Sequence, residues 1–463
     1  MTAEQVAGSF RDRKGYVFTL GNRVFRSVSS AAAPVQREFI ESKVFAHLVA
    51  AGQFIGTKVA SEDPAELGIP NAALLLEHER IAFVSFPYEW PFAALRAAAL
   101  LQLDVHLQLL DHGFTLSDAS AYNIQFRGPK PVFIDCLSVE RYVEGSYWLG
   151  HRQFCDQFLS PLLFSAKFGV PFNAMYRGRL EGFSTTELAS LLRLRDKFSL
   201  QTLLNVVIPS RLETSARRGR VDAKKAVARR ALPKSSLRGM LVGLRRWIER
   251  LAPPSSLTDW TAYANDNTYQ SAERDAKRGF VEMAVKAAAP GTVLDLGCNT
   301  GDYSNVALGA GAGLVIGAEA DPATAHLAFR RAEAEALNFL PLVQDATNPS
   351  PAQGWLDKER PSFAERGNFD FLVALAVEHH LAIGRNIPLD QMIKWMVGLA
   401  PQGVIEFVQK SDTTIQRMLA LREDIFADYT EDNFRNLLAS NARIVDSAKV
   451  SDEGRIIFHY DRR

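Results

Sequence analysis

The segment VLDLGCNTGDYS (residues 293–304) decides the fold of the second half of this 463-residue chain. A short apolar run suited to a buried strand ends at Asp295 and Leu296, and a helical pattern opens behind the following turn. Gly297 and Gly301 bracket this turn, where a missing Cβ lets a ligand approach the backbone. Because ligands of open α/β sheets bind at the carboxyl ends of strands, the segment predicts a ligand site.

The chain around this segment alternates short apolar runs with helical stretches from about residue 259 to residue 463. Such alternation predicts an α/β Rossmann-like, doubly wound sheet. The runs that suit buried strands are TVLDLG (292–297), LVIGAE (314–319), FLPLVQD (339–345), FDFLVALA (369–376), GVIEFV (403–408) and RIIFHY (455–460).

Acidic residues end the first three of these runs. Glu319 lies about one βα unit after Asp295, where a carboxylate can accept hydrogen bonds from both hydroxyls of a ribose. Asp345 ends the third run, where it can accept a donor from an adenine amine. The glycine turn alone would suit nucleotides of several kinds, and each acid alone is an ordinary turn residue. Three acids at successive strand ends indicate a nucleoside-bearing cofactor.

The segment 291–376 resembles the class I S-adenosylmethionine-dependent methyltransferases. Its DLGCNTG turn has that family's D-x-G-x-x-x-G form and not the G-x-G-x-x-G of dinucleotide enzymes. The resemblance implies that the turn frames the methionine part of S-adenosylmethionine, that Glu319 holds the ribose and that Asp345 meets the adenine edge. The cofactor-binding residues implied are Asp295, Gly297, Cys298, Asn299, Gly301, Glu319, Asp345 and Ala376.

The fourth run leads into Glu378, His379 and His380, which are the candidate catalytic residues. By the same resemblance, this strand end faces the transferred methyl group. A histidine has a near-neutral pKa and can deprotonate a hydroxyl, although either ring could instead cap a helix or pack against the sheet. The segment lacks the N-P-P-Y or D-P-P-Y pattern of amide and adenine methylation, so an oxygen acceptor is predicted.

A second motif lies in the first half, in LSDASAYNIQFRGPKPVFIDCLS (116–138). Four residues separate Asp118 from Asn123, and Asp135 follows an apolar run. With a long apolar helix before it and FVSFPYEWPF (83–92) at the place of a hinge, the segment resembles a degenerate protein-kinase-like or aminoglycoside-phosphotransferase-like domain. That resemblance implies that Asp118 orients an acceptor hydroxyl and that Asn123 and Asp135 hold Mg²⁺ beside ATP.

Several features depart from an active kinase. A Leu-Ser pair precedes the first acid, a Cys-Leu pair follows the second, and no glycine-rich loop is present. Arg26 stands where the kinase lysine is expected, with Glu38 or Glu41 as its predicted partner, and Arg is a poor substitute for a compact ammonium. The sequence therefore predicts a kinase-like fold without phosphotransfer. In the alternative interpretation, Asp118 forms an Asx turn and Asn123 a cap in an unrelated α+β domain.

The order of the patterns predicts three parts. Residues 1–212 form a degenerate kinase-like α+β domain, with strands near 15–29, 73–78 and 81–86 and a helix over 35–52. Residues 213–258 form a basic helical linker, and residues 259–463 form the methyltransferase domain. The linker is either a solvated connection or a patch for RNA, anionic lipid or a sulfated or phosphorylated substrate. Few aromatic residues are interleaved with its charges, which disfavours nucleic acid as a partner.

A long insertion, DATNPSPAQGWLDKERPSFAERG (345–367), separates the third and fourth runs. Loops of this size often carry specificity. The candidate recognition residues in and beyond it are Trp355, Arg360, Arg366, Arg422 and Tyr429, and each could equally be packing or surface charge. With the segments FPYEW, DASAYNIQF, RQF, HHL and REDIFADY, the chain resembles bacterial nodulation-associated and uncharacterised methyltransferases over most of its length.

Composition bounds the remaining choices. With 47% hydrophobic residues, 23% charged residues and a net charge of +1, the chain suits a soluble globular protein with no global field for an anionic partner. Three separated cysteines and no secretory pattern favour a reducing, cytoplasmic compartment. The most apolar stretch, 90–110, is interrupted by charges and predicts a buried helix and no membrane span. Composition says nothing of oligomeric state.

Together these patterns predict a methyltransferase that uses S-adenosylmethionine on a small-molecule or glycan acceptor, at oxygen, with the first domain recognising substrate or partner. One alternative is a bifunctional kinase-methyltransferase that modifies a saccharide end. Another is an RNA- or protein-binding module whose methyltransferase fold senses a ligand.

Overall fold

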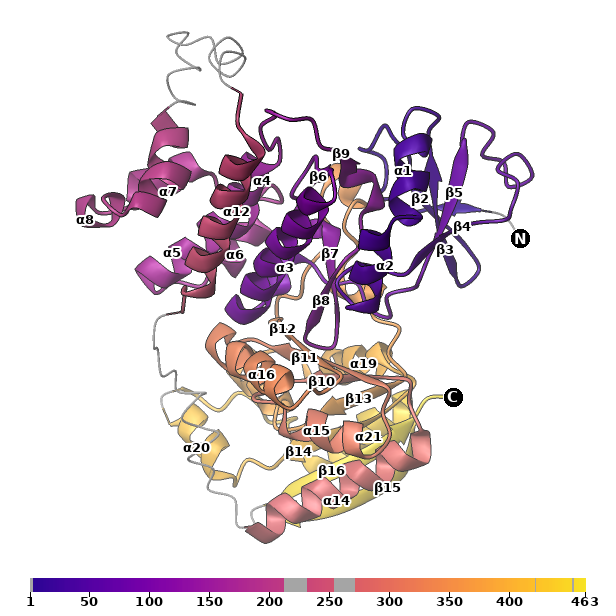
Figure 1. Cartoon of the computed structure of the whole chain (residues 1–463). Helices are drawn as coiled ribbons and strands as arrows, with labels where there is room; N and C mark the ends of the chain where they lie inside the picture. Colours follow the sequence, from indigo (N-terminus) through magenta and orange to yellow (C-terminus); the bar gives the residue numbers. More distant parts are fainter. Residues whose placement is uncertain (1–2, 212–230, 254–270, 421, 452–453) are drawn as a thin grey trace. The chain divides into compact units, whose positions relative to one another are not determined.

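The structure is a computed structural model that describes the chain except residues 1–2, 212–230, 254–270, 421 and 452–453. It divides into two compact units, which we describe separately (Figure 1). The first unit comprises Met1–Ser255 together with Ala352–Arg360, and the second comprises Ser256–Pro351 together with Pro361–Arg463.

The first unit begins with a five-stranded antiparallel sheet in the order β1-β2-β3-β5-β4. Helices α1 and α2 follow β3, and Ser42 separates them because its hydroxyl caps the first turn of α2. The single helix predicted over 35–52 is therefore two helices. The bounds are β1 Glu4–Gln5, β2 Val17–Leu20, β3 Arg23–Val28, α1 Ala33–Ile40, α2 Lys43–Ala50, β4 Thr57–Val59 and β5 Leu74–His78.

The apolar segment 81–86 is not a strand, which corrects the prediction. Its backbone pairs with a side chain instead, since the Ser85 N–H donates to Gln125 Oε1 at 2.9 Å and the Ser85 carbonyl accepts from Gln125 Nε2 at 3.0 Å. The chain then enters the short helix η1 (Pro87–Glu89) and the long helix α3 (Phe92–Asp111). Among the described residues, α3 alone has the length and apolarity to cross a membrane, but most of it is buried inside the first unit.

Two short ribbons carry the kinase-type segment. Strand β6 (Phe114–Leu116) pairs with β9 (Val139–Arg141), and β7 (Ile124–Arg127) pairs with β8 (Lys130–Phe133). Between them lie the short helices η2 (Ala121–Asn123) and η3 (Cys136–Ser138). The pairing brings both acid-bearing loops to one place. Strands followed by helices confirm the α+β arrangement predicted for the first half.

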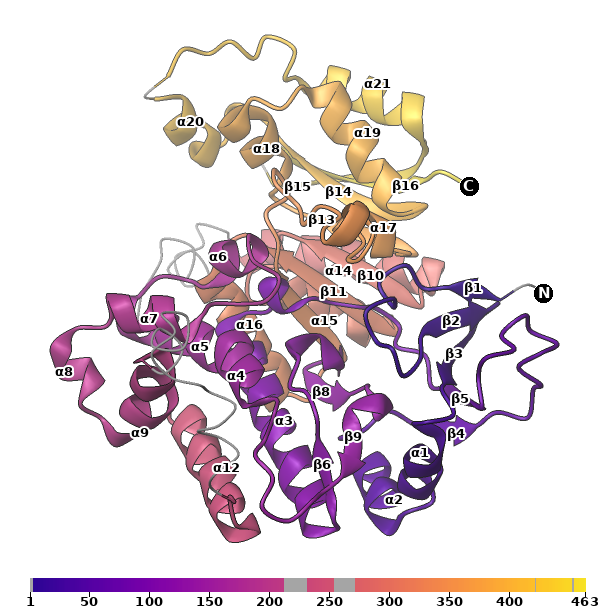
Figure 2. The same cartoon turned by 90° about the horizontal axis from the view of Figure 1, so that it is seen from above.

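Helices complete the first unit (Figure 2). They are α4 His151–Phe154, η4 Cys155–Leu159, α5 Ser160–Phe168, α6 Asn173–Arg177, α7 Thr185–Leu191, α8 Leu194–Lys197, α9 Leu200–Thr202, η5 Leu203–Val207 and α12 Lys234–Glu249. The last of these, α12, packs along α3, and Arg245 binds Asp104 with N–O distances of 2.5 and 3.3 Å. Its buried side chains are Leu237, Leu241, Leu244 and Ile248.

The predicted linker 213–258 thus differs from the structure over its described part. Helix α12 belongs to the first unit, because it presents an apolar stripe at helical spacing to that unit's core. The densest basic run, from Arg217 to Arg230, lies outside the described residues.

The second unit contains a seven-stranded sheet in the order β12-β11-β10-β13-β14-β16-β15. Neighbours from β12 to β14 are parallel, while β16 is antiparallel to both β14 and β15. The bounds are β10 Thr292–Leu296, β11 Leu314–Glu319, β12 Phe339–Val343, β13 Phe371–Ala374, β14 Gln402–Val408, β15 Arg443–Ser451 and β16 Arg455–Asp461. The prediction omitted β15, an edge strand in which only two of nine residues are buried and which therefore lacks an apolar run.

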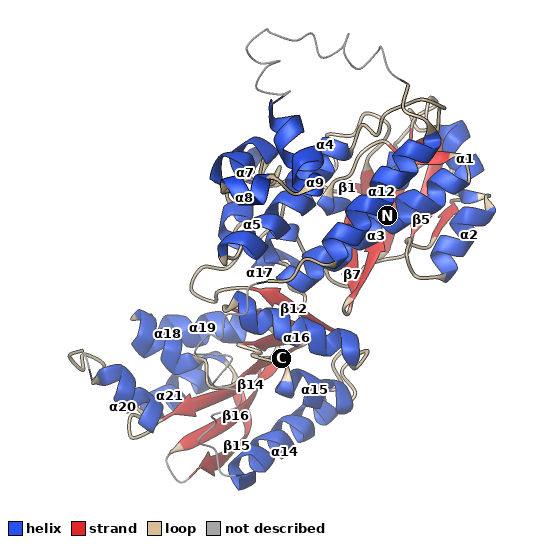
Figure 3. Ribbon diagram, turned by 60° about the vertical axis from the view of Figure 1, so that its left-hand side comes forward, coloured by secondary structure: helices blue, strands red, loops and turns tan. Residues whose placement is uncertain are grey.

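Helices cover both faces of this sheet (Figures 2 and 3). Helix α14 packs with α15 and α16 on one apolar core against the sheet, while α19 and α21 lie on the other side. This confirms the predicted Rossmann-like, doubly wound fold. The bounds are α14 Ser271–Ala288, α15 Asp302–Gly309, α16 Pro322–Ala334, α17 Phe363–Arg366, α18 Glu378–Arg385, α19 Leu389–Leu399, α20 Thr413–Leu419 and α21 Glu431–Asn441.

The packing of α12 is testable with a matched pair of substitutions. Leu244 is fully buried, so Leu244→Ala should lower the free energy of unfolding by about 2–5 kcal/mol through lost burial and a cavity. Arg246, two positions later on the same helix, is exposed, so Arg246→Ala should change it by less than about 0.5 kcal/mol. Urea denaturation followed by tryptophan fluorescence measures both. Equal, small effects would show that this helix is a solvated linker after all.

Candidate functional site

A cavity of about 450 Å³ opens in the second unit at the carboxyl ends of β10, β11, β12 and β13. Its size falls within the range of small-molecule and cofactor sites. Seven of the eight predicted cofactor-binding residues line it: Asp295, Gly297, Cys298, Asn299, Glu319, Asp345 and Ala376. The structure therefore brings together residues that lie up to 81 positions apart in the sequence, from Asp295 to Ala376.

The turn after β10 requires its glycines. Gly297 has a φ of +72°, and a Cβ there would lie 2.4 Å from Val377 Cγ2. Gly301 has a φ of +86°, and a Cβ there would lie 2.5 Å from the Phe339 ring. Gly301 is the one of the eight predicted cofactor-binding residues that does not line the cavity. It caps the start of α15, and its N–H donates to the Cys298 carbonyl at 2.8 Å. A side chain at either glycine would push this turn away from the sheet.

Two buried carboxyls flank the turn. Asp295 is only 3% exposed, and its Oδ2 accepts a hydrogen bond from Ser304 Oγ at 2.6 Å. Burial, with a contribution from Glu319, raises the pKa of Asp295 to about 7. Glu319 accepts the Asn299 N–H at 2.9 Å on one oxygen and the Asp321 N–H at 2.9 Å on the other. Glu319 thus ties the tip of the turn to the end of β11, and burial raises its pKa.

The third acid, Asp345, organises its own loop. Its Oδ1 accepts from the Thr347 N–H at 2.8 Å and from Thr347 Oγ1 at 2.7 Å. The neighbouring Gln344 forms a two-way clamp with Ser350, at 2.9 Å through the hydroxyl and 3.1 Å through the backbone N–H. Gln344, Asp345 and Thr347 all line the cavity, so this loop forms the wall at the β12 end.

The structure separates the three candidate catalytic residues. His380 lines the cavity, whereas Glu378 and His379 are not among the described residues that do so. Glu378 is buried and accepts from the Val408 N–H at 2.6 Å, with the Tyr429 hydroxyl 2.9 Å away. His379 is 1% exposed, and its Nδ1 lies 3.0 Å from Glu378 Oε2. The contacts of Glu378 hold the start of α18 against β14. Consecutive helical residues point in different directions, so His380 can face the cavity while its two neighbours are buried.

His380 faces the cavity in its neutral form. Burial lowers its pKa to about 3, and His379, whose ring centre lies 4.2 Å away, acts in the same direction. A ring with this pKa is uncharged at neutral pH and can accept a hydrogen bond, but it is a weaker base than the histidine of near-neutral pKa that the sequence predicts. Ala376, just before α18, has a φ of +53° and donates its N–H to Glu406 Oε2 at 2.9 Å.

Sequence reasoning missed an ionic cluster in the same wall. Lys277 Nζ lies 2.6 Å from Glu406 Oε1, and both side chains are almost fully buried. Arg455 lies 3.6 Å from the same oxygen and donates to Asp412 at 2.7 Å. Burial lowers the pKa of Lys277, although Glu406 opposes the shift. The sequence feature that could have indicated this cluster is Glu406, the single acid inside the apolar run GVIEFV. Nothing in the charged sequence of α14 identifies Lys277 as its partner.

The other loop candidates occupy ordinary positions. Tyr429 belongs to the buried Glu378 contacts, and Arg422 donates to the Ile383 carbonyl and to Asn386 at the end of α18. Arg366 binds the Pro361 carbonyl at 3.1 Å, while Trp355 is 63% exposed. Arg360 belongs to the first unit.

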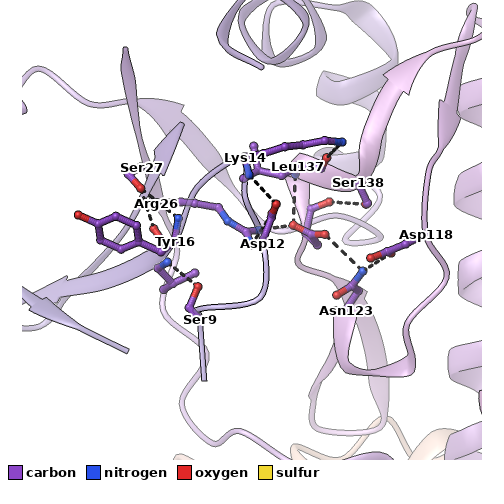
Figure 4. Close-up of polar contacts among 12 residues, drawn as sticks. Ser9, Asp12, Lys14, Tyr16, Arg26, Ser27, Asp118, Asn123, Leu137 and Ser138 are labelled. Carbon is purple, nitrogen blue, oxygen red and sulfur yellow. Dashed lines mark hydrogen bonds and ion pairs between the residues drawn. The ribbon is translucent and has the colours of Figure 1, made fainter. Parts of the chain in front are cut away.

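The kinase-type residues also come together, as Figure 4 shows. Asn123 Nδ2 donates to Asp118 Oδ1 at 2.7 Å and to Asp135 Oδ2 at 3.3 Å. Arg26 forms an ion pair with Asp135 through the other carboxylate oxygen, which also accepts the Leu137 N–H at 3.2 Å. Burial and the nearby Asp135 raise the pKa of Asp118 to about 7. Asp135, predicted to hold a metal, is therefore already neutralised by a side chain.

The predicted partner of Arg26 was wrong. Glu38 pairs with Arg141, while Arg26 contacts Asp135 and lies 3.6 Å from Asp12. The guanidinium of Arg26 divides its nitrogens between two acids, since Nη1 pairs with Asp135 and Nη2 lies near Asp12. Among the residues described, no cluster of three or more His, Cys, Asp or Glu is arranged to hold a metal. The loop's geometry gives no support to the Mg²⁺ and ATP that the resemblance implied.

Comparison with known proteins gives one close relative among those compared. The nodulation protein NoeA of Rhizobium meliloti (strain 1021) is 43% identical over 461 residues, covering 99% of this chain and 96% of NoeA. No family model matches the chain.

Solved structures give more distant matches. The bifunctional kinase-methyltransferase WbdD is 16% identical, with a TM-score of 0.30 over 45% of this chain and 43% of WbdD, less than half its length. The N-methyltransferase NodS of Bradyrhizobium japonicum WM9 is 15% identical, with a TM-score of 0.30 over 42% of this chain and 98% of NodS. Magnesium protoporphyrin IX methyltransferase of Synechocystis PCC 6803, with bound SAH, is 20% identical, with a TM-score of 0.32 over 48% of this chain and 94% of that enzyme.

At these TM-scores the solved structures assign no activity to the present chain. The identity to NoeA extends over both units and nearly all of both sequences. The chain belongs to the family of nodulation protein NoeA.

Proposed function

We propose that this protein is a methyltransferase that transfers the methyl group of S-adenosylmethionine to an oxygen of a small-molecule or glycan acceptor. The observation that carries the proposal is the set of three acids, Asp295, Glu319 and Asp345, which end three neighbouring strands and line one cavity. The proposal extends to a cytoplasmic location and to a first unit that recognises substrate or partner.

The residues fit the proposed cofactor. The turn at Gly297 passes so close to Val377 that no Cβ fits, and Asn299 and Asp295 beside it line the cavity, where they can hold the methionine part. Glu319 offers carboxylate oxygens to the ribose hydroxyls, and Asp345 offers an acceptor to the adenine amine. When bound, S-adenosylmethionine supplies an electrophilic methyl group on a sulfonium that is already a good leaving group.

The chain's own residues then have three tasks in the methyl transfer. The cavity wall must align the acceptor and exclude water, and a side chain must accept the acceptor's proton. His380 is the described histidine on this wall, and we assign the acceptor's proton to its ring. Burial lowers the pKa of His380 to about 3, so in the empty site this ring is a weaker base than an exposed histidine. Glu406 restrains the strained Ala376 backbone beside it, while Lys277 balances the charge of Glu406. Histidine as the acceptor of a hydroxyl proton is what favours oxygen methylation.

The alternatives receive less support. Phosphotransfer would require Asp135 to hold a metal, but Asp135 is paired with Arg26. A nucleic-acid role would depend on the basic run at 217–230, which lies outside the described residues.

Glu319 tests the cofactor. Glu319→Gln should weaken S-adenosylhomocysteine binding at least roughly tenfold, because a charged acceptor for the ribose is worth about 1.5–3 kcal/mol. Calorimetric titration of the full-length protein measures this loss. Glu282→Gln, an exposed acid on α14, is the control and should leave the dissociation constant unchanged. If the unmodified protein binds neither S-adenosylmethionine nor S-adenosylhomocysteine, the proposed cofactor is wrong.

The raised pKa of Asp295 predicts a pH dependence. With a pKa of about 7 in the free protein, Asp295 is largely protonated below that pH, whereas the cationic cofactor favours its carboxylate. Binding at low pH must therefore release a proton, so affinity should fall by up to about tenfold per pH unit below about 7 and level off above it. Titrations between about pH 5.5 and about 8.5 measure the slope, which Asp295→Asn should largely remove. A slope that is unchanged in Asp295→Asn would contradict the assignment.

The two histidines can be separated. His380→Ala should lower transfer of labelled methyl from S-adenosylmethionine into extract acceptors by about 10²–10⁴-fold, the usual contribution of a positioned proton acceptor, with stability unchanged. His379→Ala should instead lower the free energy of unfolding by about 1–3 kcal/mol, since it leaves buried Glu378 without one partner. Label incorporation and thermal unfolding of both variants provide the comparison. Full activity in His380→Ala would rule out its proton-accepting role.

A further inference from the structure

Large apolar side chains are exposed together where α7, α8, α9 and η5 follow one another in the first unit. We call this set the α7–η5 patch, and its members are Leu191, Leu194, Phe198, Leu200, Leu204 and Ile208. Leu194 and Phe198 are 75% and 79% exposed. Helix α7 packs against η5, and Figures 2 and 3 show these short helices grouped at one end of the unit. The exposed side chains therefore come from neighbouring elements of one unit.

The helix formed by α9 and η5 exposes the side chains that a surface helix ordinarily buries. Its buried residues include the polar Thr202 and Asn205 beside Val206. Leu200 and Leu204, which lie four positions apart on one face of the helix, are exposed. In an ordinary surface helix the apolar stripe faces the core and the polar residues face water. An apolar stripe that gains nothing from folding indicates a surface that contacts a partner.

Polar contacts hold this helix in its rotation. Thr202 Oγ1 lies 2.6 Å from the hydroxyl of Ser199 at the helix start. Asn205 Nδ2 donates to the Gln201 carbonyl at 3.0 Å, and Asn205 Oδ1 lies 3.2 Å from Nε2 of His151 on α4. Turning the leucines inward would expose these side chains and break their contacts, and a buried His151 without its partner would be costly. The folded unit itself therefore keeps the apolar stripe in solvent.

The charges around the α7–η5 patch are almost all positive. Arg193, Arg195 and Lys197 alternate with members of the patch along the chain. Asp196 is the only acid from the first to the last member of the patch, and it lies 3.1 Å from Lys167 Nζ. Apolar side chains interleaved with cations match a surface that is apolar inside and anionic at its boundary.

A protein partner is the competing occupant. The centres of protein–protein interfaces are enriched in tyrosine and tryptophan, and hydrogen-bonding groups surround them. The α7–η5 patch contains leucine, isoleucine and one phenylalanine, with no tyrosine or tryptophan. Leucine and phenylalanine beside lysine and arginine are typical of helices that lie in the boundary layer of a membrane. The composition thus favours lipid over protein.

We propose that the α7–η5 patch binds the surface of a membrane that contains anionic phospholipid. The apolar side chains of the patch enter the boundary between headgroups and acyl chains, while Arg193, Arg195 and Lys197 meet the lipid phosphates. This binding is peripheral, since it uses side chains of short helices and no membrane-spanning element. The inference goes beyond the proposed function and does not depend on cofactor binding.

Co-sedimentation of the full-length protein with lipid vesicles tests the apolar part. The unmodified protein should bind vesicles of phosphatidylcholine with phosphatidylglycerol, and should bind phosphatidylcholine alone more weakly. Phe198→Ser should lower the partition coefficient at least roughly tenfold, because one large apolar contact with the membrane is lost. Thermal unfolding should not change, since Phe198 is exposed in the folded protein. Val143→Ser, at another exposed apolar position of the same unit, is the matched control and should bind normally.

A second pair of variants tests the charges. Arg195→Gln should lower binding to the anionic vesicles about fivefold, the contribution of one cation near such a surface. Arg37→Gln, at an exposed position on α1, changes the net charge equally and should have little effect. Raising the salt concentration should weaken binding of the unmodified protein, because exposed charges are screened.

Three results would overturn the proposal. The first is no binding of the unmodified protein to the anionic vesicles. The second is binding that Phe198→Ser and Arg195→Gln leave unchanged, or that the control variants weaken equally. The third is a dimer in sedimentation velocity that Phe198→Ser dissociates, because the α7–η5 patch would then contact a second copy of the chain.

Discussion

The arrangement of the second unit depends on one steric constraint, the left-handed turn that follows β10. Gly297 passes so close to Val377 that no Cβ fits between them, which joins the end of β10 to the start of α18. The same turn presents the Asn299 N–H to Glu319 on β11. Two neighbouring strand ends and the helix beside the proposed methyl-transfer point are thus held at fixed spacing before any ligand binds. Preorganised polar groups of this kind cost little reorganisation when charge or ligand arrives.

The residues of this turn could be predicted because their chemistry is local. A glycine at positive φ and an acid at a strand end are determined by a few neighbouring positions, so the sequence alone predicts that Asp295, Gly297, Glu319 and Asp345 lie at strand ends beside one cavity, where the structure has them. The Rossmann-like sheet followed from the apolar runs for the same reason. The edge strand β15 did not, since an exposed edge needs no apolar run.

What the sequence could not provide were choices made by distant partners. Which of two adjacent histidines faces the cavity depends on the rotation of α18, and Glu378 sets that rotation through Val408 and Tyr429. Lys277 and Glu406 are 129 positions apart in the sequence, and they form an ion pair because the fold packs α14 against β14. Likewise Arg26 pairs with Asp135, while the helix acid Glu38 pairs with Arg141. The spacing of these residues in the sequence does not reveal which pairs form.

In the first unit the three polar residues of the segment 116–138 meet one another in the folded chain. Asp118, Asn123 and Asp135 meet through hydrogen bonds, so the loop keeps its shape. The guanidinium of Arg26 supplies the positive charge beside Asp135, and removing that charge would leave a buried carboxylate uncompensated. The contacts of these three residues are therefore satisfied by side chains of the chain itself, since a carboxylate that is buried needs a paired charge or hydrogen bonds to compensate the loss of water.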